Sequence, residues 1–120
     1  MIRVSGCSFE QSGYKDTDGG GYWKASTLYA AAKEQGCERF RLPLEHMDLT
    51  YRRFTGDRIA DVAYYFRRML ETYLKYPILL GPLGNILDGA HRVAKAYALG
   101  KKWVWALKLK ELPEPDEKDA

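Results

Sequence analysis

The residues best suited to chemistry form the run Asp-Gly-Ala-His-Arg at positions 88–92, which stands between a predicted strand and a predicted helix. Backbone N–H groups in the first turn of a helix have no partner within the helix, so they attract anions to its N-terminus. Gly89 would let a ligand approach the backbone, and Arg92 and Lys95 would add positive charge. The run is therefore a candidate phosphate-binding turn.

Two side chains of this turn have several roles open to them. The position of Asp88 before the helix suits a magnesium ligand, a base toward a hydroxyl group, or a cap of the helix, and spacing alone favours the cap. His91 is suited to donate to a phosphate oxygen or to move a proton. Taken without outside support, the turn fits a structural role and an anion site equally well.

Periodicity predicts the elements that position this turn. Helical spacing of apolar residues predicts helices over 24–35, 57–74 and 90–99. Alternation of apolar and polar residues predicts strands over 2–9, 39–44 and 103–109. Two apolar runs around glycine and proline predict a hairpin over 77–87. We therefore expect an α/β fold of the mixed α+β type, in which a small mixed sheet packs against helices.

Two apolar patterns predict core positions. In the helix over 57–74, which Asp57 is placed to cap, the apolar residues share one face and the charged residues the other. That face comprises Ile59, Val62, Ala63, Phe66, Met69, Leu70 and Tyr73. In the strand over 103–109, Trp103 and Trp105 share a face, and we expect both rings in the core.

Composition narrows the class of protein. A chain of 120 residues with 46% hydrophobic and 29% charged residues predicts one globular domain over 1–112, followed by a flexible acidic tail over 113–120. The net charge of +3 is too small to indicate a dedicated nucleic-acid or membrane-surface protein. Cys7 and Cys37 form neither a zinc motif nor a disulfide framework. With no long apolar run, we expect a cytoplasmic protein without a membrane partner.

Several segments together resemble one known superfamily. They are Pro77-Ile78-Leu79-Leu80 through Asp88-Gly89-Ala90-His91-Arg92, then Ala94, Ala96, Gly100 and the strand over 103–109, together with Arg41-Leu42-Pro43-Leu44 and Met47-Asp48-Leu49 upstream. This set, which covers residues 41–109, resembles the ParB N-terminal/sulfiredoxin-like superfamily, in particular small stand-alone ParB-like proteins of bacteria and phages. The resemblance implies a single domain of that fold.

The resemblance also implies a ligand and a set of roles. In this superfamily the matching turn binds nucleotide phosphates, so the implied cofactor is ATP, ADP or CTP with magnesium. The implied phosphate contacts are Gly89, Ala90, His91, Arg92 and Lys95; the implied catalytic residues are Asp88, His91, Glu45 and Asp48, with Asp88 also holding the magnesium.

The form of the turn distinguishes between branches of the superfamily. Sulfiredoxins carry a cysteine before the His-Arg pair, where this chain has Ala90, and partition proteins carry a Gly-Glu-Arg-Arg type of turn. The Asp-Gly-x-His-Arg form is nearer to the serine-kinase branch. The implied function is a nucleotide-binding protein that acts as a phosphotransferase or nucleotide hydrolase.

A non-enzymatic binding module is the alternative. In that interpretation the same turn holds a phosphate of DNA or RNA, or a partner protein, and Arg52 and Arg53 extend the contact surface. Steep salt dependence would mark it.

Overall fold

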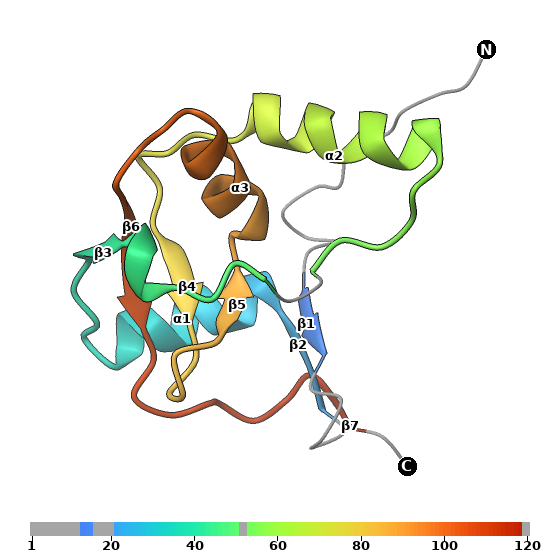
Figure 1. Cartoon of the computed structure of the whole chain (residues 1–120). Helices are drawn as coiled ribbons and strands as arrows, with labels where there is room; N and C mark the ends of the chain where they lie inside the picture. Colours follow the sequence, from blue (N-terminus) through green and yellow to red (C-terminus); the bar gives the residue numbers. More distant parts are fainter. Residues whose placement is uncertain (1–12, 16–20, 51–52, 119–120) are drawn as a thin grey trace.

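The computed structural model describes residues 13–15, 21–50 and 53–118 (Figure 1). In chain order the elements are β1 (Gly13–Lys15), β2 (Gly21–Lys24), α1 (Ala25–Glu34), β3 (Phe40–Pro43), the 3-10 turn η2 (Leu44–His46), α2 (Ile59–Glu71), β4 (Ile78–Leu80), β5 (Ile86–Asp88), α3 (Ala90–Ala98), β6 (Trp103–Lys108) and β7 (Glu117–Lys118). The mixed α+β class is confirmed. The strand predicted over 2–9 lies outside the described residues.

The larger sheet has four strands in the order β3-β6-β4-β5. β4 and β6 run parallel, with Ile78 level with Ala106, and the other two pairs are antiparallel. A tight turn closes the β4–β5 hairpin, where Gly81 N donates to Asn85 O at 2.8 Å. β5 then leads directly into α3, so the candidate turn begins at the end of an edge strand.

The two faces of this sheet bury different helices. Ile78 and Leu80 on β4 point into a cluster that contains Val93 and Ala96 of α3, whereas Leu79 between them points into a cluster with Leu28 of α1. Side chains alternate between faces along a strand, so these neighbouring residues hold helices on opposite sides of the sheet. The result is a three-layer arrangement of α1, sheet and α3 (Figure 1).

A second sheet, in the order β1-β2-β7, includes the end of the described chain. The sequence predicted a flexible tail from residue 113, but residues 113–118 lie against β2 and α1. Asp116 accepts hydrogen bonds from Lys24 N at 2.8 Å and Thr27 Oγ1 at 3.0 Å, and Trp23 Nε1 donates to Pro113 O at 2.8 Å. Asp116 thus serves as a cap for α1, whose own N-cap residue, Lys24, has no side-chain acceptor.

The tryptophans of β6 are not in the core, contrary to the prediction. Val104 and Ala106 are buried instead, against α3, while Trp103 and Trp105 lie half-buried on the other face. There the guanidinium of Arg39 stacks on Trp105, with 4.2 Å from Cζ to the ring centroid. Both faces of this strand are apolar in sequence, so alternation alone did not show which face α3 covers.

Helix α2 also differs from its prediction. It packs mainly on α3, beyond the sheet, and none of its residues is buried (Figure 1). Most of its predicted core face points to solvent, with Ile59 87% and Leu70 63% exposed, while Ala63 and Met69 are half-buried. Asp61, rather than Asp57, accepts the hydrogen bond from Arg58 N at the helix start. No helix in the described ranges is long and apolar enough to cross a bilayer.

Removing the charge of Asp116 tests its role as a cap of α1. Hydrogen bonds from Lys24 N and Thr27 lower the pKa of Asp116, so its contribution to stability is present at neutral pH and is lost as the pH falls through the folded-state pKa. We expect Asp116→Asn to lower the melting temperature measured by circular dichroism at pH 7. Glu114→Gln, which alters only an exposed ion pair with Lys118, is the control and should change it little.

Candidate functional site

The turn at 88–92 brings the chain from β5 into α3 through a left-handed residue. Gly89 is the N-cap of α3 and has φ +106°, and a Cβ atom there would lie 2.6 Å from Ile78 Cγ2. The Gly89 carbonyl accepts from Arg92 N at 2.9 Å and Val93 N at 3.1 Å. The N–H groups of Ala90 and His91 precede these in the first helical turn, where no helical carbonyl is in reach. They form the anion-attracting end of α3.

Asp88 and Arg92 lie together, but they face each other and the protein. Arg92 Nη2 is 3.3 Å from Asp88 Oδ2, and both side chains are more than four-fifths buried. Arg92 Nη1 donates to the carbonyls of Tyr76 and Pro77, and Tyr29 Oη donates to Asp88 Oδ2 at 2.9 Å. Burial, followed by the nearby charge of Asp88, raises the pKa of Tyr29. Arg92 therefore joins β4, β5 and α1 to α3.

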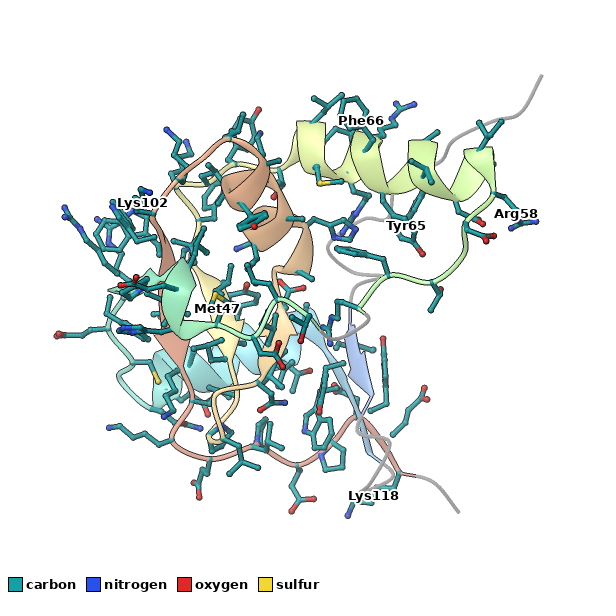
Figure 2. The ribbon with its side chains drawn as sticks, in the orientation of Figure 1. Met47, Arg58, Tyr65, Phe66, Lys102 and Lys118 are labelled. Atoms are coloured by element: carbon teal, nitrogen blue, oxygen red, sulfur yellow. The ribbon has the colours of Figure 1, made fainter. Side chains whose placement is uncertain are left out.

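His91 is held in a ring of aromatic side chains. Its imidazole packs against Phe54, with centroids 5.1 Å apart, and against Tyr65 on the inner side of α2 (Figure 2). Its Nε2 is buried and has no hydrogen-bond partner among the described residues. Burial, followed by the positive charges of Arg68 and Arg53, lowers the pKa of His91 to about 4. His91 is therefore neutral at pH 7 and offers a phosphate no positive charge.

A pocket of about 410 Å³ opens beside the first turn of α3. Its walls are mostly apolar, and their polar groups belong to Asp48, Thr50, Arg53 and the hydroxyl of Tyr97. The lining residues are Asp48, Leu49, Thr50, Arg53, Phe54, Ile86, Ala90, Val93, Ala94 and Tyr97. Ala90, Val93, Ala94 and Tyr97 line it at helical spacing, so the pocket runs along one side of α3 and reaches the first turn of the helix at Ala90, with Arg53 in the same wall.

The two charged residues of the pocket are fixed by nearby groups. Arg53 Nη2 donates to Leu87 O at 3.3 Å. Asp48 Oδ1 accepts from Thr50 N at 2.9 Å and from Thr50 Oγ1 at 2.5 Å, and these hydrogen bonds lower the pKa of Asp48. The pocket therefore presents an ionised carboxylate and a guanidinium to anything that enters it.

The other predicted site residues lie elsewhere. Lys95 Nζ donates to Thr72 O at 2.7 Å and so ties α3 to the end of α2. Glu45 is exposed on η2 and is not in the wall of this pocket. Arg52 lies outside the described residues. Of the predicted set, the pocket brings together Asp48, Arg53 and Ala90.

Sequence reasoning missed three contributors. Tyr29 joins Asp88 from 59 positions away, and nothing local in the sequence indicates this pairing. Phe54 lies outside every predicted helix and strand, and no pattern in the sequence marks it as a site residue. Tyr97 falls at helical spacing with Val93 and Ala94, which does not mark it as a site residue, yet it lines the pocket and is 67% exposed.

The magnesium implied by the resemblance fits one carboxylate better than the other. Asp88 is already paired with Arg92 and Tyr29, which both donate to its Oδ2. Asp48 borders the pocket, and magnesium is commonly held by one or two carboxylates together with substrate phosphates. Among the described residues, no group of three His, Cys, Asp or Glu side chains is placed to hold a metal ion on its own.

No protein-family model, curated protein or solved structure matches this chain. The resemblance to the ParB N-terminal/sulfiredoxin-like superfamily therefore stays a prediction from the sequence. The function must be argued from the geometry of the site.

The close contact between Gly89 and Ile78 predicts unequal costs for two similar substitutions. Gly84 also has a positive φ, +86°, but a Cβ there meets nothing within 4 Å. We expect Gly84→Ala to cost about 1 kcal/mol of unfolding free energy from backbone strain, and Gly89→Ala to cost about 2–4 kcal/mol from strain plus the clash with β4. Urea denaturation measures both. Equal costs would contradict this account of the turn.

The neutral state of His91 predicts a pH dependence of stability. The folded-state pKa of His91 is about 4 against 6.5 in the unfolded chain, so between these values only the unfolded chain binds the proton, and stability falls as the pH falls from 6.5 toward 4. His91→Phe keeps a ring of similar shape. It should remove about 1–2 kcal/mol of the stability difference between pH 7 and pH 4.5, as judged by urea denaturation, after allowance for the partial exposure of the ring. His46→Gln controls for loss of an exposed imidazole.

Proposed function

We propose that this domain binds a nucleotide in the pocket beside the N-terminus of α3. The observation that carries the proposal is the composition of one cavity wall. The first turn of α3 enters it at Ala90, Arg53 stands beside that turn, and the rings of Phe54 and Tyr97 line the apolar remainder. A nucleotide needs these two environments next to each other, one for its phosphates and one for its base.

Two sources of positive potential would attract the phosphates of the nucleotide to one end of the pocket. The N–H groups of Ala90 and His91 lie at the positive end of the α3 dipole. Arg53 carries five N–H donors in a planar fork, of which the bond to Leu87 O uses one, so others are available to phosphate oxygens. Arg92, which the sequence favoured for this role, is committed to Asp88 and to backbone carbonyls.

The volume of the pocket and its apolar lining are suited to hold the nucleobase. Ligand pockets commonly range from about 300 to 1,000 Å³, and the volume of about 410 Å³ falls in this range. Phe54 and Tyr97 offer aromatic rings, and such rings stack on any nucleobase because every base has a π face. These contacts do not select one base.

Asp48 indicates which class of reaction this site is suited to catalyse. Its ionised carboxylate is suited to hold magnesium against bound phosphates or to accept a proton from an attacking hydroxyl. Magnesium would neutralise charge on the phosphates. Phosphoryl transfer or nucleotide hydrolysis is the chemistry that this arrangement supports, with Asp48 rather than Glu45 or Asp88 as the acting carboxylate.

Calorimetric titration with ATP, ADP, CTP and GTP, with and without magnesium, tests the proposal. We expect at least one nucleotide to bind, and Arg53→Ala to weaken it about tenfold or more through the loss of a charge-assisted contact. Ala94→Phe, which would fill the pocket, should abolish binding while the circular dichroism spectrum is retained. Arg39→Ala is the control, because Arg39 stacks on Trp105 on the other side of the sheet.

A second variant separates the role of magnesium from that of the pocket. Without the metal, the Asp48 carboxylate repels phosphate, so Asp48→Asn should strengthen metal-free binding and reduce the effect of magnesium. Absence of binding by every nucleotide, together with salt-dependent binding of short DNA or RNA, would contradict the proposal and favour the non-enzymatic nucleic-acid module.

A further inference from the structure

An apolar stripe runs along the solvent side of α2. Its members are Ile59, Val62, Phe66, Leu70 and, just past the helix, Tyr73, which are 87, 58, 58, 63 and 64% exposed. At 100° per residue the four helical members fall within an arc of roughly 80°. We call these five residues the α2 stripe. Contiguous exposed apolar surface on a soluble domain marks an interaction site.

Within the part of the chain that the structure describes, the fold does not use the α2 stripe. The side of α2 that packs on the domain is the opposite one, where Tyr65 reaches Phe54 and His91. Figure 2 shows Phe66 on the outer side of the helix, directed away from the rest of the molecule. The stripe is thus apolar for a reason that the core of this domain does not supply.

We propose that a second copy of this chain covers the α2 stripe, with the two α2 helices packed antiparallel about a two-fold axis at Phe66. In a two-fold interface, a residue that contacts another must be contacted by it in return, so the surface must complement itself. The stripe meets this condition because Val62 and Leu70 each lie four residues from Phe66. Val62 then faces the partner's Leu70, and Phe66 faces the partner's Phe66.

The ends of the stripe follow the same symmetry. Ile59 and Tyr73 each stand seven positions from Phe66, so the spacing along the stripe reads 3, 4, 4, 3 in either direction. Pairing would therefore bring Ile59 of each copy toward the end of α2 that leads into Tyr73. A surface shaped for an unrelated protein has no need of this reversal symmetry.

The charges around the stripe favour a protein partner over a membrane. Arg58 pairs with Asp61 at 3.0 Å, and Arg67 pairs with Glu71 at 2.9 Å. Positive and negative charges therefore accompany each other along the helix, without the strongly basic face that draws amphipathic helices to anionic lipid. An apolar centre with a polar rim of mixed charge is the usual composition of a protein–protein interface.

The size of the stripe sets the expected strength. Apolar side chains exposed to this degree each present on the order of 100 Å², so two copies would bury roughly 1,000 Å², which is near the lower limit for specific interfaces. We therefore expect a reversible dimer that dissociates at micromolar concentrations. The proposal does not depend on the nucleotide pocket, which lies on α3.

Sedimentation over a wide range of protein concentration tests the proposal. We expect a monomer–dimer equilibrium, and Phe66→Glu should weaken it by about tenfold or more, because two like charges would meet at the axis. Leu83→Glu is the matched control, since Leu83 is 96% exposed on the β4–β5 turn, away from α2. Its equilibrium should equal that of the unaltered chain.

Cross-linking tests the antiparallel arrangement. In a Cys7→Ser, Cys37→Ser background, Phe66→Cys should form a disulfide-linked dimer on oxidation, because the two thiols meet at the axis. Ile59→Cys should not, since antiparallel pairing separates the two copies of residue 59 by 14 residues along the helix, or about 21 Å. Equal cross-linking at both positions would overturn the antiparallel arrangement.

Two further outcomes would overturn the proposal itself. A chain that stays monomeric at all concentrations, with Phe66→Glu lowering its melting temperature, would mean that this chain covers the stripe with its own residues. A monomer whose melting temperature is unchanged by Phe66→Glu would assign the stripe to a different molecule. Dimerisation that survives Phe66→Glu would place the interface elsewhere.

Discussion

The guanidinium of Arg92 connects α3 to the start of β4 and to the end of β5 through polar contacts. It binds the Tyr76 and Pro77 carbonyls where the chain enters β4, and Asp88 where β5 ends. Tyr29 brings α1 into the same group from the other side of the sheet. When one member of such a buried charged pair is removed, the other is left without compensation, at a typical cost of about 3–5 kcal/mol. The position of α3, and of its N-terminus, depends on this group.

This dependence changes the meaning of the Asp-Gly-Ala-His-Arg run. From the sequence, its arginine and histidine both suited phosphate, yet in the structure Arg92 is neutralised within the protein and His91 is an uncharged ring under α2. What remains available to an anion is the backbone, with Arg53 beside it. The run builds the helix end that a ligand would use, and most of its own side chains hold that end in place.

Local sequence predicted the elements well, because their signals are local. The helix predicted over 24–35 is α1 (Ala25–Glu34), and the strand, turn and helix around Asp88 occur where glycine, proline and apolar spacing placed them. The strands of the second sheet, β1, β2 and β7, were not predicted, and the other failures concern which face is covered. Alternation along β6 offers two apolar faces, and only the close approach of α3, through Ala96 and Ala106, decides between them. Likewise, the spacing on α2 identified an apolar face without showing what lies against it.

The site was harder to predict for a related reason. The Asp48–Arg53 segment and the first turn of α3 are about 40 residues apart in sequence, and hydrogen bonds to Leu87 O and within the loop bring them to one cavity. Pairing Asp88 with Tyr29 requires α1 to be packed already. A motif found along the chain therefore locates the start of α3 without showing that Asp88 and Arg92 pair with each other and with Tyr29.

The cap on α1 has a consequence for the order in which the molecule is built. Asp116 accepts a hydrogen bond from Lys24 N, which is 92 residues away in sequence. β7 pairs with β2 over a similar sequence separation. As the chain leaves the ribosome, β2 can pair with β1 at once, but its second partner, β7, and the cap on α1 appear only after almost all the rest of the chain. Loop closure over so long a separation makes this layer the slowest to assemble, whereas the β4–β5–α3 segment can form from near neighbours.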